Sequence, residues 1–399
     1  MSASPALAAD VLVNLFGAAG AVLLAREAHR NDPRGAVTRR IVVALGLVAA
    51  LFLVRVMAWA GDGTLAHALS TLLAASTPLA SLLVAEGMLR RHAPRALKLA
   101  LAAAPFVVTV VGRLPFVPEW AGNAMLMIVV TGGFAAIAGL LWTRDASSLT
   151  ASENSAVRGV LVALLVLAPM IATDFRSLWP EVPVRLGALG ALVLLYVGLG
   201  SGNLGATLIA RAVNVALFVA CAATLALGIA AVIPDLGHAD FVRAVAVSLS
   251  AILLSALWVQ NHNRLDDGEQ TLQPLLAVRT REDFARLLAE HPLFGGARVL
   301  GDATLDNVRH PGFASLFEHQ PTLRHSAAPW GRAATDPGVE RALSLMTAYE
   351  ATHLGLVSRE PLRLVAFSLP ATASDAGTES AVEVARLVGE IVYLEAERT

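Results

Sequence analysis

Long apolar runs dominate the first 260 residues and exclude an ordinary soluble fold for this part of the chain. A helix needs about 20 mostly apolar residues to cross the ~30 Å hydrocarbon core of a bilayer. Only 15% of the residues are charged, whereas a soluble domain carries about 25%. We therefore predict a polytopic α-helical membrane bundle over residues 1–260. Nine runs have the required length, at residues 7–25, 41–60, 65–87, 97–116, 122–142, 157–178, 183–200, 208–233 and 240–259.

Basic residues are distributed unevenly over the connections between these runs. Cytoplasmic loops of membrane proteins carry an excess of arginine and lysine. With the N-terminus outside, the cytoplasmic connections and span ends hold 12 basic residues and the outer ones hold four. An odd number of spans then places the C-terminal part in the cytoplasm. The first nine residues lack the basic segment of a cleaved signal peptide, so we expect the first span to be uncleaved. The expected location is a bacterial-type inner membrane, with a multi-pass topology.

Several charged side chains fall inside the predicted spans, where a charge is costly and by default functional. They come from different spans but share the depth of the outer end. They can therefore form a pocket for an anionic or amphiphilic signal, with Asp174 as the counter-ion of Arg55 or Arg113. The alternative is that the basic side chains extend to the outer lipid headgroups. The residues at this depth are Arg55, His67, Arg113, Asp174, Arg176 and Arg243. The predicted ligand-binding residues are Arg55, His67, Arg113 and Asp174.

The sequence carries no recognisable catalytic or metal-binding pattern. Its one cysteine, Cys221, lies in an apolar run, which excludes a disulfide or a multi-thiolate site within one chain. The histidines after residue 290 lack zinc-type spacing, and no phosphate loop or nucleophile elbow occurs. Residues 261–399 hold 13 basic against 19 acidic residues, which argues against a nucleic-acid surface. We expect no catalytic residues, no metal and no cofactor.

The chain changes character after residue 260. A polar linker at 261–279 leads into a soluble domain at 280–399. Pro274 and the acidic residues before it interrupt a heptad-like stripe in the linker, so we expect a flexible joint rather than a coiled coil. Thr280 and Asp283 have the spacing of a capping box, which predicts the start of a helix.

The remainder of this domain shows the patterns of a small α+β fold. Asp336 followed by Pro337 predicts a second helix start. Two apolar runs at 353–358 and 361–369 predict a β-hairpin. Apolar residues at helical spacing predict a terminal helix over 378–396. The expected fold is an α+β domain with a small antiparallel sheet.

The hairpin from Ala351 to Leu369 and the helix from Ala381 to Ala396 resemble the C-terminal half of a GAF domain. In that family two central strands precede a helix that packs on the sheet and usually continues into an output module. Membrane spans joined to such a domain are also similar to the input modules of membrane histidine kinases. No phosphoacceptor histidine box or ATP-binding box is present. The resemblance, which covers at most residues 270–398, implies a sensor that acts through a separate kinase or response regulator.

Three functions agree with this organisation. The first is a membrane signal-transducing protein that couples an intramembrane sensor to the GAF-like domain, with a separate kinase, a response regulator or a second copy as its partner besides the lipid bilayer. The alternative is a transporter or membrane-embedded enzyme with a regulatory domain, which requires Arg55, Asp174 and Arg113 to surround one polar cavity. The third is a scaffold whose soluble domain only docks partners. We favour the first, because a junction between the last span and a soluble domain suits a protein that passes information from the membrane to the cytoplasm.

Overall fold

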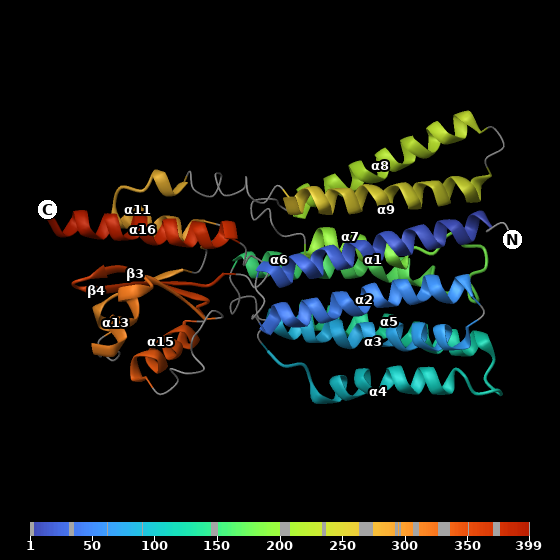
Figure 1. Cartoon of the computed structure of the whole chain (residues 1–399), viewed down its shortest axis with the longest axis horizontal. Helices are drawn as coiled ribbons and strands as arrows, with labels where there is room; N and C mark the ends of the chain where they lie inside the picture. Colours follow the sequence, from blue (N-terminus) through green and yellow to red (C-terminus); the bar gives the residue numbers. More distant parts are fainter. Residues whose placement is uncertain are drawn as a thin grey trace.

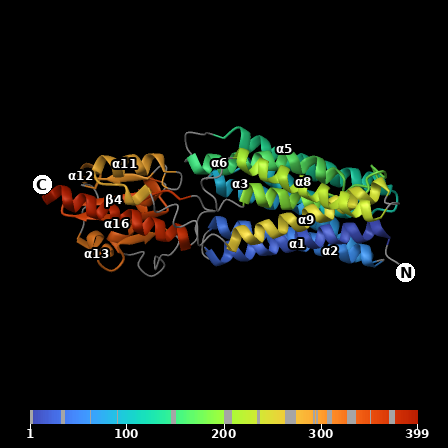
Figure 2. The same ribbon diagram turned by 90° about the horizontal axis from the view of Figure 1, so that it is seen from above.

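The chain forms a long helical bundle and a smaller domain that contains a sheet, which lies beyond one end of the bundle (Figure 1). Figure 2 shows the same end-to-end arrangement from above, with the N-terminus at the far end of the bundle. The computed structural model describes residues 4–398 except 32–35, 62, 90, 145–150, 200–207, 234–236, 263–273, 292–293, 295–296, 306–310, 326–335, 350 and 370–375. Most of the predicted linker therefore lies outside the described residues.

Each predicted apolar run overlaps one α-helix of the described part of the bundle. Among the described residues, six helices are long and apolar enough to cross a membrane, namely α1, α2, α3, α5, α8 and α9. They are compatible with a multi-pass membrane protein, while the three further spans stay predictions because α4 and the apolar parts of α6 and α7 are shorter. The elements are α1 (Pro5–Asn31), α2 (Ala36–Ala60), α3 (Thr64–Leu89), α4 (Arg95–Val111), α5 (Glu119–Trp142), α6 (Ala151–Ala172), α7 (Gly187–Leu194), the π-helix η2 (Leu195–Leu199), α8 (Leu208–Val232) and α9 (His238–His262).

Three predicted spans differ from the structure at their outer ends. Helix α4 stops at Val111, ahead of Pro115, which lacks the backbone N–H that a helix requires. Helix α6 stops at Ala172, and α7 begins only at Gly187, so residues 173–186 form a series of turns. Prolines at positions 180 and 183 oppose a helix there. Arg113, Asp174 and Arg176 thus lie in connections between helices rather than inside spans.

Apolar side chains cover the outside of the bundle as well as its interior. Leu65, Leu99 and Val232 are each more than 70% exposed, and a surface of this kind fits lipid better than water. In the interior, α3 and α5 approach closely where Gly133 faces Pro78, since a Cβ on the glycine would lie 2.5 Å from the Cβ of the proline. Small residues at helix contacts are typical of membrane bundles.

The C-terminal domain contains a four-stranded antiparallel sheet in the order β1-β4-β3-β2. The predicted hairpin is confirmed as β3 and β4. Both predicted helix starts are also confirmed, because Thr280 and Asp283 form the capping box of α11 and Asp336 accepts a hydrogen bond from the N–H of Gly338 at the start of α15. The elements are α11 (Arg281–Glu290), β1 (Arg298–Leu300), α12 (Asp302–Leu305), α13 (Pro311–His319), β2 (Thr322–Arg324), α15 (Pro337–Ala348), β3 (His353–Arg359), β4 (Leu362–Phe367) and α16 (Ala376–Arg398).

Helices cover both faces of this sheet (Figure 1). Val357 and Val365 pack with Phe284 of α11 on the face that α11 and α16 cover. Leu356 and Leu364 point to the other face, into a cluster with side chains of α13 and α15. Alternate side chains of one strand point to opposite faces. The two central strands therefore read as continuous apolar runs in the sequence because both of their faces are buried.

His353, at the start of β3, is expected to make the domain less stable in mild acid. Its side chain is buried, and burial together with the positive charge of Arg324 lowers its pKa from 6.5 to about 4. Between these values the unfolded chain binds a proton that the folded domain does not. The full stability is therefore present above pH 6.5 and falls as the pH drops toward 4. At 1.36 kcal/mol per pH unit, the loss is about 3 kcal/mol.

Amide hydrogen exchange of β3 and β4 between pH 7 and pH 4.5 measures this loss, after correction for the intrinsic pH dependence of exchange. A His353→Gln variant should show a much flatter stability profile. His325→Gln, which changes an exposed histidine of the same domain, serves as the matched control and should keep the wild-type slope. An unchanged slope in His353→Gln would show that another group causes the acid sensitivity.

Candidate functional site

A cavity of about 630 Å³ lies among α2, α3, α4, α5, the connection between α4 and α5 and the 173–186 connection. All four predicted ligand-binding residues, Arg55, His67, Arg113 and Asp174, line it. Arg176 lines it as well, whereas Arg243, predicted at the same depth, does not. The starts of α3 and α5, which contribute to its lining, lie at the end of the bundle that holds the N-terminus, opposite the C-terminal domain (Figure 1).

Asp174 connects α2 to the start of α7. Its Oδ2 accepts an ion-paired hydrogen bond from Nη1 of Arg55, the counter-ion that the sequence predicts. Its Oδ1 accepts a hydrogen bond from the N–H of Gly187 at 2.9 Å, and the Oγ1 of Thr173 accepts one from the N–H of Leu186 at 2.8 Å. The first N–H groups of a helix have no partner within the helix. Asp174 and Thr173 therefore cap α7 from 13 residues upstream.

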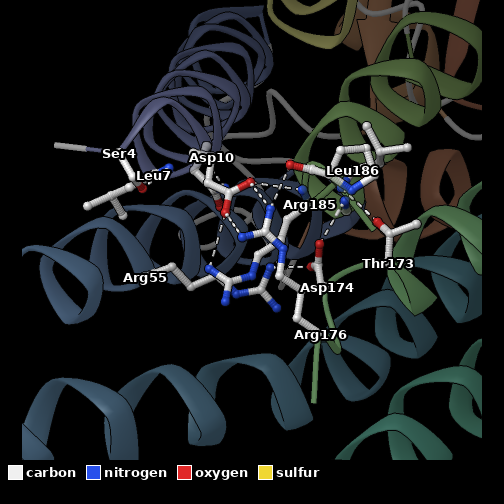
Figure 3. A network of polar contacts seen from close by, with 12 residues as sticks. Ser4, Leu7, Asp10, Arg55, Thr173, Asp174, Arg176, Arg185 and Leu186 are labelled. Atoms are coloured by element: carbon white, nitrogen blue, oxygen red, sulfur yellow. Dashed lines mark hydrogen bonds and ion pairs between the residues drawn. The ribbon is translucent and has the colours of Figure 1, made fainter. Parts of the chain in front are cut away.

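Asp10 of α1 forms the second carboxylate centre, and sequence reasoning missed it. Its side chain is 1% exposed and pairs with Nη1 of Arg176 at 3.0 Å and Nη1 of Arg185 at 3.4 Å. The backbone N–H of Arg185 also donates to it at 2.9 Å. Figure 3 shows Asp10 and Asp174 together with the arginines of this network. The signal was available, because Asp10 is a carboxylate within the first predicted span, the same criterion that selected Asp174.

The arginine side chains also bind the backbone of the 173–186 connection and the ring of a tryptophan. The carbonyl oxygen of Pro183 accepts hydrogen bonds from Arg176 Nη2 and Arg243 Nε, each at 3.0 Å. The guanidinium of Arg185 lies 4.3 Å from the centre of the Trp59 ring, which is a cation–π contact. Hydrogen bonds, ion pairs and a cation–π contact thus hold the 173–186 connection in place beside the cavity.

Arg113 and His67 occupy a more open part of the lining. Both side chains are exposed. Nη1 of Arg113 donates to the carbonyl oxygen of Thr64 at 3.1 Å, and within the described part of the chain no carboxylate forms an ion pair with it. Arg113 therefore keeps a positive charge that no side chain of the site neutralises by direct contact.

Chemically, the site can bind and orient a charged group. The described residues contain no cluster of histidine, cysteine, aspartate and glutamate suited to a metal ion. The expectation that the chain has no catalytic residues and no cofactor stays a prediction.

The substitution Gly187→Ala is expected to disrupt the Asp174 centre. A Cβ at this position would overlap Oδ2 of Asp174 and lie 2.7 Å from its Cγ, so the carboxylate must leave Arg55 or α7 must shift. Overpacking of this kind costs about 1–3 kcal/mol. The expected result is a lower melting temperature in detergent.

Gly132→Ala is the matched control, because a Cβ on Gly132 of α5 meets no atom within 4 Å. Alanine has the higher helix propensity, so this variant should melt at or slightly above the wild-type temperature. Equal melting temperatures for the two variants would show that Asp174 does not occupy the position described.

Comparison with protein-family models, curated proteins and solved structures gives no match.

Proposed function

We propose that this chain is an integral membrane signalling protein. Its bundle, with nine spans, the N-terminus outside and the C-terminal domain in the cytoplasm, binds a small solute in the cavity near the outer surface. Occupation of the cavity changes the packing of the bundle and, through α9, the state of a GAF-like domain. The proposed orientation rests on the excess of basic residues in the connections at the end of the bundle that faces the C-terminal domain.

The observation that carries this proposal is the position of α7 between the cavity and the last helix. Asp174, which lines the cavity, holds the first N–H of α7. Helix α7 packs against both α1 and α9. Since α9 is the last helix before the C-terminal domain, a change at Asp174 has a continuous packed route toward that domain.

The arrangement of the C-terminal domain supports its proposed GAF-like character. The two central strands, β3 and β4, are followed directly by α16, and α16 packs on β3. This is the order of elements on which the resemblance rests. A kinase, a response regulator or a second copy of the chain would then receive the signal from this domain.

A transporter or membrane-embedded enzyme with a regulatory domain is the second candidate. The observation in its favour is that Arg55, Asp174 and Arg113 do line one cavity. The two functions differ in what happens to the bound solute. A transporter releases it on the other side of the membrane and an enzyme changes it, whereas a sensor returns it unchanged to the same side.

Amide hydrogen exchange on the full-length protein in lipid nanodiscs tests the coupling without knowledge of the ligand. Arg55→Gln removes the partner of Asp174 and should alter exchange in α7, in α9 and in the β3–β4 hairpin. Arg95→Gln, which changes an exposed arginine at the start of α4, is the control and should leave the hairpin unchanged. Changes confined to α7 and the 173–186 connection would overturn the proposed coupling.

A further inference from the structure

The charges around the cavity are unequal. Its lining contains two acidic residues, Glu119 and Asp174, against four arginines. Asp10, which lies behind the lining, neutralises part of the charge of two of these arginines. In this part of the structure four arginines thus face three carboxylates. The arginines outnumber the carboxylates even when His67 is left out. The arginines are Arg55, Arg113, Arg176 and Arg185.

Hydrogen-bonding groups at this site are also left without partners. The Oγ1 of Thr109 and the Nε of Arg176 are buried, and neither has a hydrogen-bond partner among the described residues. A buried donor without a partner costs about 1–3 kcal/mol. Both residues belong to the lining of the cavity.

The remaining lining combines polar and apolar side chains. Several hydroxyl and amide side chains line it, and one pair is joined by a 2.8 Å hydrogen bond from Asn123 Nδ2 to Ser177 Oγ. A few polar groups placed in a partly apolar wall can fix the orientation of a compact polar group. These side chains are Thr64, Ser70, Thr71, Thr109, Asn123 and Ser177.

From these three observations we infer that the cavity binds an oxyanion, a carboxylate or phosphate group, and that this group competes with Asp174 for Arg55. Guanidinium groups bind carboxylate and phosphate through paired N–H donors. Arg113, which has no carboxylate in direct contact, is the primary anchor. Arg55 is the shared partner, because it is already paired with a carboxylate that the ligand resembles.

The competition gives the ligand a defined effect. An anion bound to Arg55 displaces the carboxylate of Asp174 from this arginine. Asp174 then still caps α7 but is no longer paired with α2. The oxyanion belongs either to a free solute or to a lipid headgroup, and the chemistry of recognition is the same. This inference names the ligand class of the proposed sensor and therefore rests on the proposed function.

Binding is measured on the full-length protein in nanodiscs of phosphatidylcholine. The probes are inorganic phosphate and citrate, with choline and glucose as the cationic and neutral comparisons. Phosphate or citrate should bind, and choline and glucose should not. Arg113→Gln should weaken binding at least tenfold. Arg113→Lys keeps the charge but loses the paired donors. Its affinity for the anion should lie between those of the wild type and Arg113→Gln. Arg91→Gln, which changes an exposed arginine outside the cavity, should bind as the wild type does.

The competition itself is tested with Asp174→Asn, which retains an acceptor for Gly187 but removes the competing charge. It should bind the anion several-fold more tightly than the wild type. If this variant does not fold, Arg55→Lys takes its place and should bind several-fold more weakly. Binding of choline or glucose, or anion binding that no cavity variant alters, would overturn the inference.

Nanodiscs that contain phosphatidylglycerol distinguish the two sources. Loss of phosphate and citrate binding in these discs, restored at higher probe concentration, identifies the headgroup as the native oxyanion. Unchanged binding identifies a free solute, and both results support the inference. If the anion binds but exchange in the β3–β4 hairpin stays the same, the proposed function fails and the inference stands. If a neutral or cationic probe alters the hairpin, the inference fails and the proposed function stands.

Discussion

Replacing Asp10 by asparagine is expected to destabilise the bundle by about 3 kcal/mol. The carboxylate is almost fully buried and pairs with two arginines, Arg176 and Arg185. Removal of one member of a buried charge pair costs about 3–5 kcal/mol, because the partners keep their charges without compensation. Both arginines are about a quarter exposed, so water reduces the penalty to the lower end of this range.

Thermal melting of the detergent-solubilised protein, followed by size-exclusion chromatography, measures the effect of Asp10→Asn. Glu181→Gln is the matched control, because it removes a carboxylate from an exposed side chain of the 173–186 connection. The free energy of unfolding of the control should lie within about 0.5 kcal/mol of that of the wild type. If both variants melt like the wild type, Asp10 does not hold α1 to this connection.

Phe367→Ala is expected to cost about 3–5 kcal/mol in the C-terminal domain. The ring is fully buried in β4 and lies 5.6 Å, centre to centre, from the ring of Phe294. Truncation of a buried phenylalanine to alanine removes its apolar burial and leaves a cavity. Few small domains tolerate a loss of this size, so we expect the domain to unfold or to exchange its amide hydrogens throughout.

Leu276→Ala is the control for this substitution, because Leu276 is 71% exposed while its neighbour Leu275 is buried. It should leave exchange in the sheet unchanged. In Phe367→Ala the helices of the bundle should keep their slow exchange, since the ring contributes to the core of the C-terminal domain alone. Loss of protection in both parts would show that the two do not fold separately.

Part of the candidate site could be predicted, because charged residues are rare in the apolar runs of a membrane protein and are easily identified there. Arg55 and Asp174 occur in apolar runs at one depth, which is enough to suggest a pair. Asp10 meets the same criterion. Its partners Arg176 and Arg185 are more than 160 residues away along the chain, and only the folded structure brings these side chains together.

The outer ends of the short helices could not be predicted from apolar content alone. Residues 157–178 have the composition of a span, but α6 ends at Ala172. The decisive contacts are those of Thr173 and Asp174 with the N–H groups of Leu186 and Gly187. A hydropathy window averages over such contacts and therefore extends the span.

The sheet could also be predicted only in part. The β3–β4 hairpin is local and its strands have six or seven residues, so the pattern is visible in the sequence. Strand β2 has three residues and was not predicted. Strand β1 pairs with β4, more than 60 residues further on. The strand order depends on these distant pairings and cannot be read from periodicity.

The proposed function places the cavity and the C-terminal domain on opposite sides of one membrane. Single cysteines in a Cys221→Ser background, at Glu181→Cys in the 173–186 connection and at Arg359→Cys in the C-terminal domain, can be tested with a membrane-impermeant maleimide. The cysteine at position 181 should react on intact cells, and the one at 359 should react only after the membrane is opened. Reaction of both cysteines on intact cells, or of neither, would contradict the proposed topology.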